Sequence, residues 1–169
     1  ILNNRGHLSL GLRMDMSDFN LNMINPLNQI APRASFKYQL SPKWTSNSHF
    51  GRYAKLPPAI IMAANNSQNQ SDNTNFTLAD HFGTGIEYQS GKTYRVSMEI
   101  YLKNYSRAPF LQNDQIAFAN AIGTYVAVGD QPSISSAIGR AYGFEIFLQQ
   151  KLKRDYWWMA AYNFGRSEY

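Results

Sequence analysis

The sequence predicts an all-β fold: a segment of an antiparallel up-and-down transmembrane β-barrel, with about seven strands. Seven stretches alternate apolar and polar residues with a period of two, and short turns alternate with long polar connections between them. Successive strand side chains point to opposite faces, so each stretch has one apolar and one polar face. No run of about 18 apolar residues occurs, which excludes a transmembrane helix but leaves barrel strands open. Short turns at one end and long loops at the other are typical of outer-membrane barrels.

Length and composition fit part of such a barrel. The chain has 169 residues, enough for one domain, and contains no cysteine. This excludes disulfide frameworks, thiolate metal sites and cysteine nucleophiles. The mean hydropathy of −0.42 beside 14% aromatic residues suits strands that are wet on one face. The chain begins at Ile1, shows no signal peptide and ends at Tyr169 within a strand pattern. We therefore expect residues 1–169 to be a partial β-barrel domain of a larger protein.

The chain is basic, with a net charge of +5 and a pI near 9.5. Nucleic-acid binding would need these charges to gather in one patch or along one helix. They are instead scattered over the polar faces of the strands and the short turns. We therefore expect a mixed-charge solvated surface and no nucleic-acid partner.

The first three strands are expected over 7–17, 33–40 and 44–53. A polar connection ending at Pro32 joins the first two, and Ser41-Pro42-Lys43 makes a tight turn between the second and third, because proline fixes a favoured turn dihedral. A long connection over 54–79 follows. Its run of Asn, Ser and Gln predicts a solvated loop.

The fourth strand is expected over 80–89, and Ser90-Gly91-Lys92 turns the chain into the fifth. Counting outward from this turn places Glu87 opposite Arg95, and Tyr88 opposite Tyr94, as an ion pair and an aromatic pair.

The fifth strand is expected to end near Tyr105, and a second long loop covers 106–138. The sixth and seventh strands are expected over 139–150 and 156–168, joined by a short turn at 151–155. Aromatic residues gather next to the short turns, as in the interfacial girdles of membrane proteins. They are Tyr38, Trp44, Tyr88, Tyr94, Tyr156, Trp157 and Trp158.

No catalytic, metal or cofactor site is expected, and the chain is not expected to be an enzyme. The three histidines, His7, His49 and His81, are isolated in sequence and have no second ligand at a metal-site spacing. We expect them to fill the wet interior of the barrel. Glutamates on the polar faces of different strands could form an acid–base pair, but no segment supplies an organised nucleophile. The segment Gly83-Thr84-Gly85 lies inside a strand and should allow close packing of interior side chains.

Several ordered segments resemble the barrel domain of TonB-dependent outer-membrane receptors, particularly those of Bacteroidetes-type bacteria. They include Gly11-Leu-Arg13, the run from Pro32 to Trp44, Gly51-Arg-Tyr53 leading into Leu56-Pro-Pro58, Ala79-Asp-His81, Gly85-Ile-Glu-Tyr88, Ser97-Met-Glu-Ile-Tyr101 with Tyr105, and Gly139-Arg-Ala-Tyr-Gly-Phe-Glu145. Their order and spacing agree over nearly the whole chain.

The resemblance implies a barrel of about 22 strands closed by a separate plug domain. It implies a location in the bacterial outer membrane, in contact with lipid, and a scarce nutrient as ligand: a siderophore, haem, cobalamin or glycan. It also implies a TonB complex as partner, reached through a plug region that has no counterpart in this sequence.

Ligand capture in this family involves extracellular loops, and no ligand residue is shared across it. Loop residues with suitable side chains are therefore the candidates: Tyr53, Asn65, Asn66, Asp72, Asp114, Tyr125 and Asp130.

Two other functions remain open from the sequence. A soluble carbohydrate- or protein-binding β-sandwich would pack its apolar faces together and have short loops at both ends. An outer-membrane enzyme on a small closed barrel would gather Ser, His and acidic residues on one wall. The one-sided long loops disfavour the first, and the scattered histidines disfavour the second.

Overall fold

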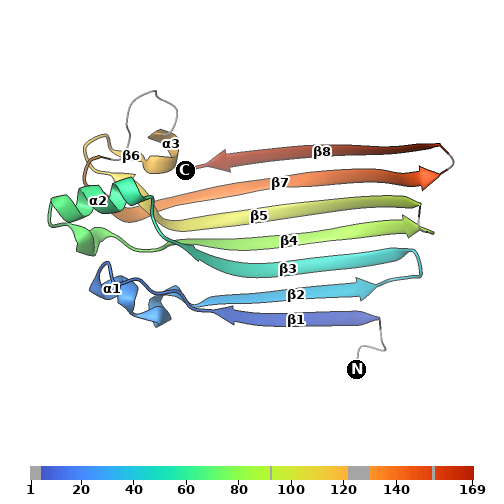
Figure 1. Ribbon diagram of the computed structural model, residues 1–169, viewed down its shortest axis with the longest axis horizontal. Helices are drawn as coiled ribbons and strands as arrows, with labels where there is room; N and C mark the ends of the chain where they lie inside the picture. Colours follow the sequence, from blue (N-terminus) through green and yellow to red (C-terminus); the bar gives the residue numbers. More distant parts are fainter. Residues whose placement is uncertain (1–4, 92, 122–129, 154) are drawn as a thin grey trace.

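A computed structural model describes residues 5–91, 93–121, 130–153 and 155–169. They form one antiparallel sheet in which seven strands follow one another in the order β1-β2-β3-β4-β5-β7-β8, while the short β6 pairs with β5 (Figure 1). The fold is therefore all-β, as the alternation predicts. The strands are β1 (Gly6–Arg13), β2 (Ala31–Gln39), β3 (Trp44–Lys55), β4 (Thr77–Ser90), β5 (Tyr94–Leu111), β6 (Ile116–Ala117), β7 (Ser133–Lys153) and β8 (Tyr156–Glu168).

Short and long connections lie at opposite ends of the sheet. The connections β2–β3, β4–β5 and β7–β8 are the short ones, and they share one end (Figure 1). The other end, called the loop end below, carries the helical segments α1 (Leu21–Ile24), η1 (Pro26–Gln29), α2 (Ala59–Ser67), η2 (Ser71–Asn73) and α3 (Phe118–Ala121). None of the helices in the described ranges is long and apolar enough to cross a membrane.

Register gives the sheet two chemically different faces. Even-numbered residues pair with even-numbered residues from strand to strand, as in Leu8 opposite Phe36, Met98 opposite Ile146 and Phe144 opposite Phe164. Paired residues point to the same side, so the even-numbered residues of β1–β5, β7 and β8 make one face, called the apolar face. The odd-numbered residues make the polar face.

The apolar face is exposed, and the packed core lies elsewhere. Leu10, Ile100 and Phe164 are 73%, 52% and 50% exposed. The buried apolar residues gather among the loop-end segments instead. One cluster contains Met23, Phe76 and Leu78 with Phe19 and Ala54 against it, and the other contains Ala108, Ala117 and Ala137 with Phe110.

The β4–β5 hairpin corrects a predicted register. Ser90 pairs with Tyr94, Gln89 with Arg95 and Tyr88 with Val96, so the predicted pairs of Glu87 with Arg95 and Tyr88 with Tyr94 are wrong. The strand runs one residue further than expected, to Ser90, and Gly91 then supplies the positive φ of 58° that the turn needs. This moves the register by two residues and leaves every side chain on its expected face.

Several boundaries also differ from expectation. Strand β1 ends at Arg13 rather than near residue 17, while β5 and β7 extend to Leu111 and back to Ser133. Their pairing continues past a register shift between Tyr105 and Ala108. The bulge ends the regular alternation while backbone pairing goes on, which is why the sequence pattern stops before the strands do.

The connection over 54–79 is structured rather than a solvated loop. Helix α2 begins directly after Pro58, whose carbonyl accepts from the backbone N–H groups of Ile61 and Met62. Ile61 and Asn65 are buried on the inner side of this helix. The Asn-, Ser- and Gln-rich part of this connection is ordered because other loop-end segments provide packing and hydrogen-bond partners for it. The composition of the connection alone does not reveal those partners.

Candidate functional site

Three strands bring a stacked group of side chains together on the polar face near the loop end. Arg33 lies opposite Gly51, and Gly51 lies opposite His81. The guanidinium carbon of Arg33 lies 4.3 Å from the ring centre of Tyr53, whose ring centre lies 4.5 Å from that of His81. A cation, a phenol and an imidazole therefore form a continuous stack from β2 through β3 to β4.

The row continues onto β5 and onto Tyr169, the residue that follows β8. Lys103 lies directly opposite His81, and its ammonium group is 5.1 Å from the ring centre of Tyr101. The rings of Tyr105 and Tyr169 lie 5.5 Å apart. Cations and aromatic rings thus lie side by side across the polar face at this level.

Small residues on the polar face make room for these large side chains. A Cβ atom on Gly83 would collide with the imidazole of His49, and one on Gly143 would meet the Tyr101 hydroxyl at 2.7 Å. Both large side chains therefore lie across the backbone of a neighbouring strand. This confirms that Gly83 serves close packing of polar-face side chains.

Charge is divided along the strands of the polar face. Toward the loops, in what we call the basic half, the odd-numbered residues of the described strands include no Asp or Glu and carry Arg13, Arg33, Lys55, Lys103 and two histidines. Toward the turns lie Glu87, Glu99 and Glu145. Arg95 pairs with Glu87 at 2.7 Å, and Asn163 donates to Glu145 at 3.1 Å. Glu99 and Glu145 lie directly opposite each other.

Buried side-chain amides tie the loop-end segments together. The amide of Asn65 donates to the Thr74 hydroxyl at 2.7 Å and to the Ser133 carbonyl at 2.9 Å, and its oxygen accepts from the Ser133 N–H at 2.9 Å. The amide of Asn20 donates to the carbonyls of Ser71 and Thr74 at 2.7 and 2.8 Å. These bonds join α1, α2, η2 and the start of β7 into one assembly.

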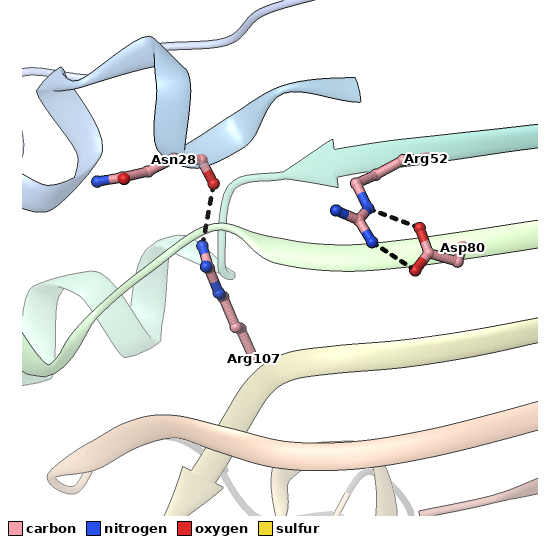
Figure 2. Close-up of polar contacts among 4 residues, drawn as sticks. All are labelled: Asn28, Arg52, Asp80 and Arg107. Atoms are coloured by element: carbon pink, nitrogen blue, oxygen red, sulfur yellow. Dashed lines mark hydrogen bonds and ion pairs between the residues drawn. The ribbon is translucent and has the colours of Figure 1, made fainter. Parts of the chain in front are cut away.

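Two arginines complete the loop end (Figure 2). Arg107, whose φ is 55°, donates to the Asn28 carbonyl at 3.1 Å and so connects β5 with η1. Arg52 makes a two-bond pair with Asp80, at 2.6 and 2.8 Å. Both members of this pair have even numbers and pair across the strands. They therefore mark the point where the apolar face becomes charged.

The structure places the predicted ligand-binding residues in different surroundings. Tyr53 belongs to the stack with Arg33 and His81, and Asp114 accepts a hydrogen bond from Gln131. Asn65 is fully buried and bonded within the loop end. Asn66, Asp72 and Asp130 are exposed, and Tyr125 lies outside the described residues. Within the described part of the chain, no hydrogen bond or ion pair joins any of these residues to another, so they form no single cluster.

Arg33, His81 and Lys103 were not among the predicted ligand residues. Their sequence signal is their position: each is an odd-numbered residue in the half of its strand that is nearer a long connection. In the described ranges, no three His, Asp or Glu side chains lie together as a metal site would require.

No family model matches the sequence, and no curated protein matches it. Among solved structures, the fold is similar to that of the FrpB iron transporter from Neisseria meningitidis (F3-3 variant), with a TM-score of 0.53 and 11% sequence identity. The match covers 82% of this chain and 19% of that transporter. The chain therefore spans about a fifth of the length of the protein it resembles, and the likeness is one of fold.

Proposed function

We propose that this chain is part of the barrel wall of a TonB-dependent receptor in a bacterial outer membrane, and that the whole receptor imports a scarce nutrient. The apolar face is the observation that carries the proposal. Strand after strand, it presents large aliphatic and aromatic side chains that no other described residue covers: Leu8, Leu10, Leu12, Phe82, Ile86, Met98, Ile100, Tyr162 and Phe164.

Exposure on this scale has a physical cost in water. Each large apolar side chain left in water forgoes about 1.5–3 kcal/mol of burial free energy, and monomeric soluble proteins rarely show a contiguous apolar patch of this kind. Lipid acyl chains would remove the cost without any protein partner. A soluble β-sandwich would cover the face with a second sheet, and the described residues form a single sheet.

Other features of the sheet agree with a membrane wall. The Arg52–Asp80 pair at the loop end and the rings of Trp44 and Tyr88 at the turn end, 4.9 Å apart, bound the apolar face. Charged and amphipathic aromatic residues favour the two interfaces of a bilayer. The likeness to FrpB supports a transporter, and the remaining strands, a plug and the TonB contact belong to the proposal as parts of the larger protein.

Lipid exposure of the apolar face can be tested by site-directed spin labelling of the full-length receptor in phospholipid vesicles. The labelled variants are Ile100→Cys on the apolar face and the matched Ser97→Cys on the polar face of the same strand, in a background without other cysteines. The measured quantity is the ratio of the label's collision rate with dissolved oxygen to its collision rate with a water-soluble nickel chelate. Oxygen concentrates in lipid, so we expect this ratio to be higher for the label at residue 100 than for the label at residue 97. Equal accessibility profiles at the two positions would overturn the membrane assignment.

A further inference from the structure

The basic half of the polar face has cations that lack acidic partners within the described residues. Arg33 and Lys103 form no ion pair there, whereas Arg13, Arg52, Arg95, Arg140 and Arg166 each pair with a carboxylate. The Nε atom of Arg33 is buried and has no hydrogen-bond partner. Arg33 and Lys103 lie at one level of the sheet with β3 and β4 between them, and each would gain a charged partner from an anion placed against this level.

Aromatic rings stand beside both cations. Tyr53 supports the guanidinium of Arg33 at 4.3 Å, and Tyr101 lies 5.1 Å from the ammonium group of Lys103. A guanidinium placed over a ring can offer its two terminal NH₂ groups to a carboxylate, sulfonate or phosphate. The exposed parts of the rings offer flat apolar surface to a planar group. The set therefore suits a ligand that is both negatively charged and planar in part.

We infer that the basic half of the polar face is a binding surface for a small anionic molecule with a planar group, held by Arg33 and Lys103 and stacked against Tyr53 or Tyr101. The inference rests on the proposed function, because in an importer the polar face borders the path of the ligand. If the inference holds, the imported ligand carries a negative charge, and a neutral glycan is disfavoured. The turn half is less suited to the same ligand, because it carries Glu87, Glu99 and Glu145 beside Lys37 and Arg95, and Arg95 is already paired with Glu87.

Binding of an anionic planar probe to the full-length receptor in detergent tests the inference. The probe is pyranine, a pyrene trisulfonate, titrated at low salt and followed by fluorescence anisotropy. We expect Arg33→Gln and Lys103→Gln each to weaken its binding about threefold to tenfold, as loss of one partly exposed ionic contact should. Added salt is expected to weaken binding by the wild-type receptor as well. The matched control is Lys37→Gln, which removes the same charge from the turn half of the same face.

Two results would overturn the inference. An equal loss of affinity in Lys37→Gln and Lys103→Gln would show a general effect of net charge. Unchanged pyranine affinity in both Arg33→Gln and Lys103→Gln, together with a lower melting temperature, would show that an acidic protein segment covers these cations instead. Neither result depends on spin-label accessibility at residues 97 and 100, so failure of the anion surface and failure of the membrane assignment are distinguishable.

Discussion

Arg95 donates two hydrogen bonds to one oxygen of Glu87, at 3.0 and 2.7 Å, although the two residues are not directly opposite each other. Gln89 faces Arg95 across the hairpin, and Ser97 faces Glu87. The pair is diagonal, with one two-residue step between its members. Long side chains bridge such a step on one face of a sheet, so the ion pair survives a register that differs from the expected one.

The Glu87–Arg95 pair is expected to contribute little to stability. Both side chains are partly exposed, and exposed ion pairs contribute about 0–1 kcal/mol. A double-mutant cycle with Glu87→Gln and Arg95→Gln, measured by denaturant unfolding in phospholipid vesicles, should give a coupling free energy of about 0.5 kcal/mol that falls with added salt. A coupling above about 2 kcal/mol would mean that this pair is shielded from water.

Asn65 is expected to hold the loop end together. Asn65→Ala removes the side-chain hydrogen bonds to Thr74 and Ser133 and leaves the Ser133 N–H and carbonyl buried without their partner. The expected loss is about 2–4 kcal/mol in the local stability of this assembly, since each unsatisfied buried group costs about 1–3 kcal/mol.

Limited proteolysis and hydrogen exchange over residues 59–76 measure this loss. Asn66→Ala is the control, because Asn66 is the exposed neighbour on the same helix. Equal protection of the two variants would contradict the role given to Asn65.

Gly83 is expected to tolerate no larger side chain while His49 lies across it. Gly83→Val would force the imidazole away and should destabilise the sheet by about 1–3 kcal/mol, the usual cost of overpacking. Gly11→Val is the control on the same face, where a Cβ would make an ordinary contact of 3.9 Å with Arg33. Addition of His49→Ala should recover most of the loss at Gly83 in denaturant unfolding. No recovery would place the strain in the backbone instead.

A charge on the apolar face is expected to be costly in lipid. Ile100→Arg should lower the free energy of unfolding in phospholipid vesicles by about 2–4 kcal/mol, the cost of arginine near the bilayer midplane of a barrel. Ser97→Arg on the polar face of the same strand should change it by less than about 1 kcal/mol. Similar losses in the two variants would contradict lipid contact at Ile100.

Much of the sheet could be predicted from the sequence because strand alternation is a local property. Side chains change face at every residue, so the assignment of Leu10, Met98 and Ile100 to one face needs no knowledge of their neighbours. The short turns and the division into two faces follow in the same way. The exact pairing of β4 with β5 does not, since a shift of two residues preserves the pattern and only the turn geometry selects between the registers.

The candidate site was likewise predicted only in part from the sequence. The residues predicted to bind ligand were chosen for their place in long polar connections, and of these only Tyr53 lies in the stack with Arg33 and His81. The sequence does not reveal that Arg33, His81 and Lys103, from three strands, fall on one level of the polar face, because that depends on how far each strand is shifted against the next.

By itself the sequence determined an all-β sheet with one apolar and one polar face, since the period of two is set by the backbone of each strand. Tertiary structure alone decided that Asn65 is buried. Its amide meets Thr74 and Ser133 only when α2 packs against the start of β7, from residues far away in the chain. The same holds for Arg33 and Lys103, which share a surface because two intervening strands pair in one particular register.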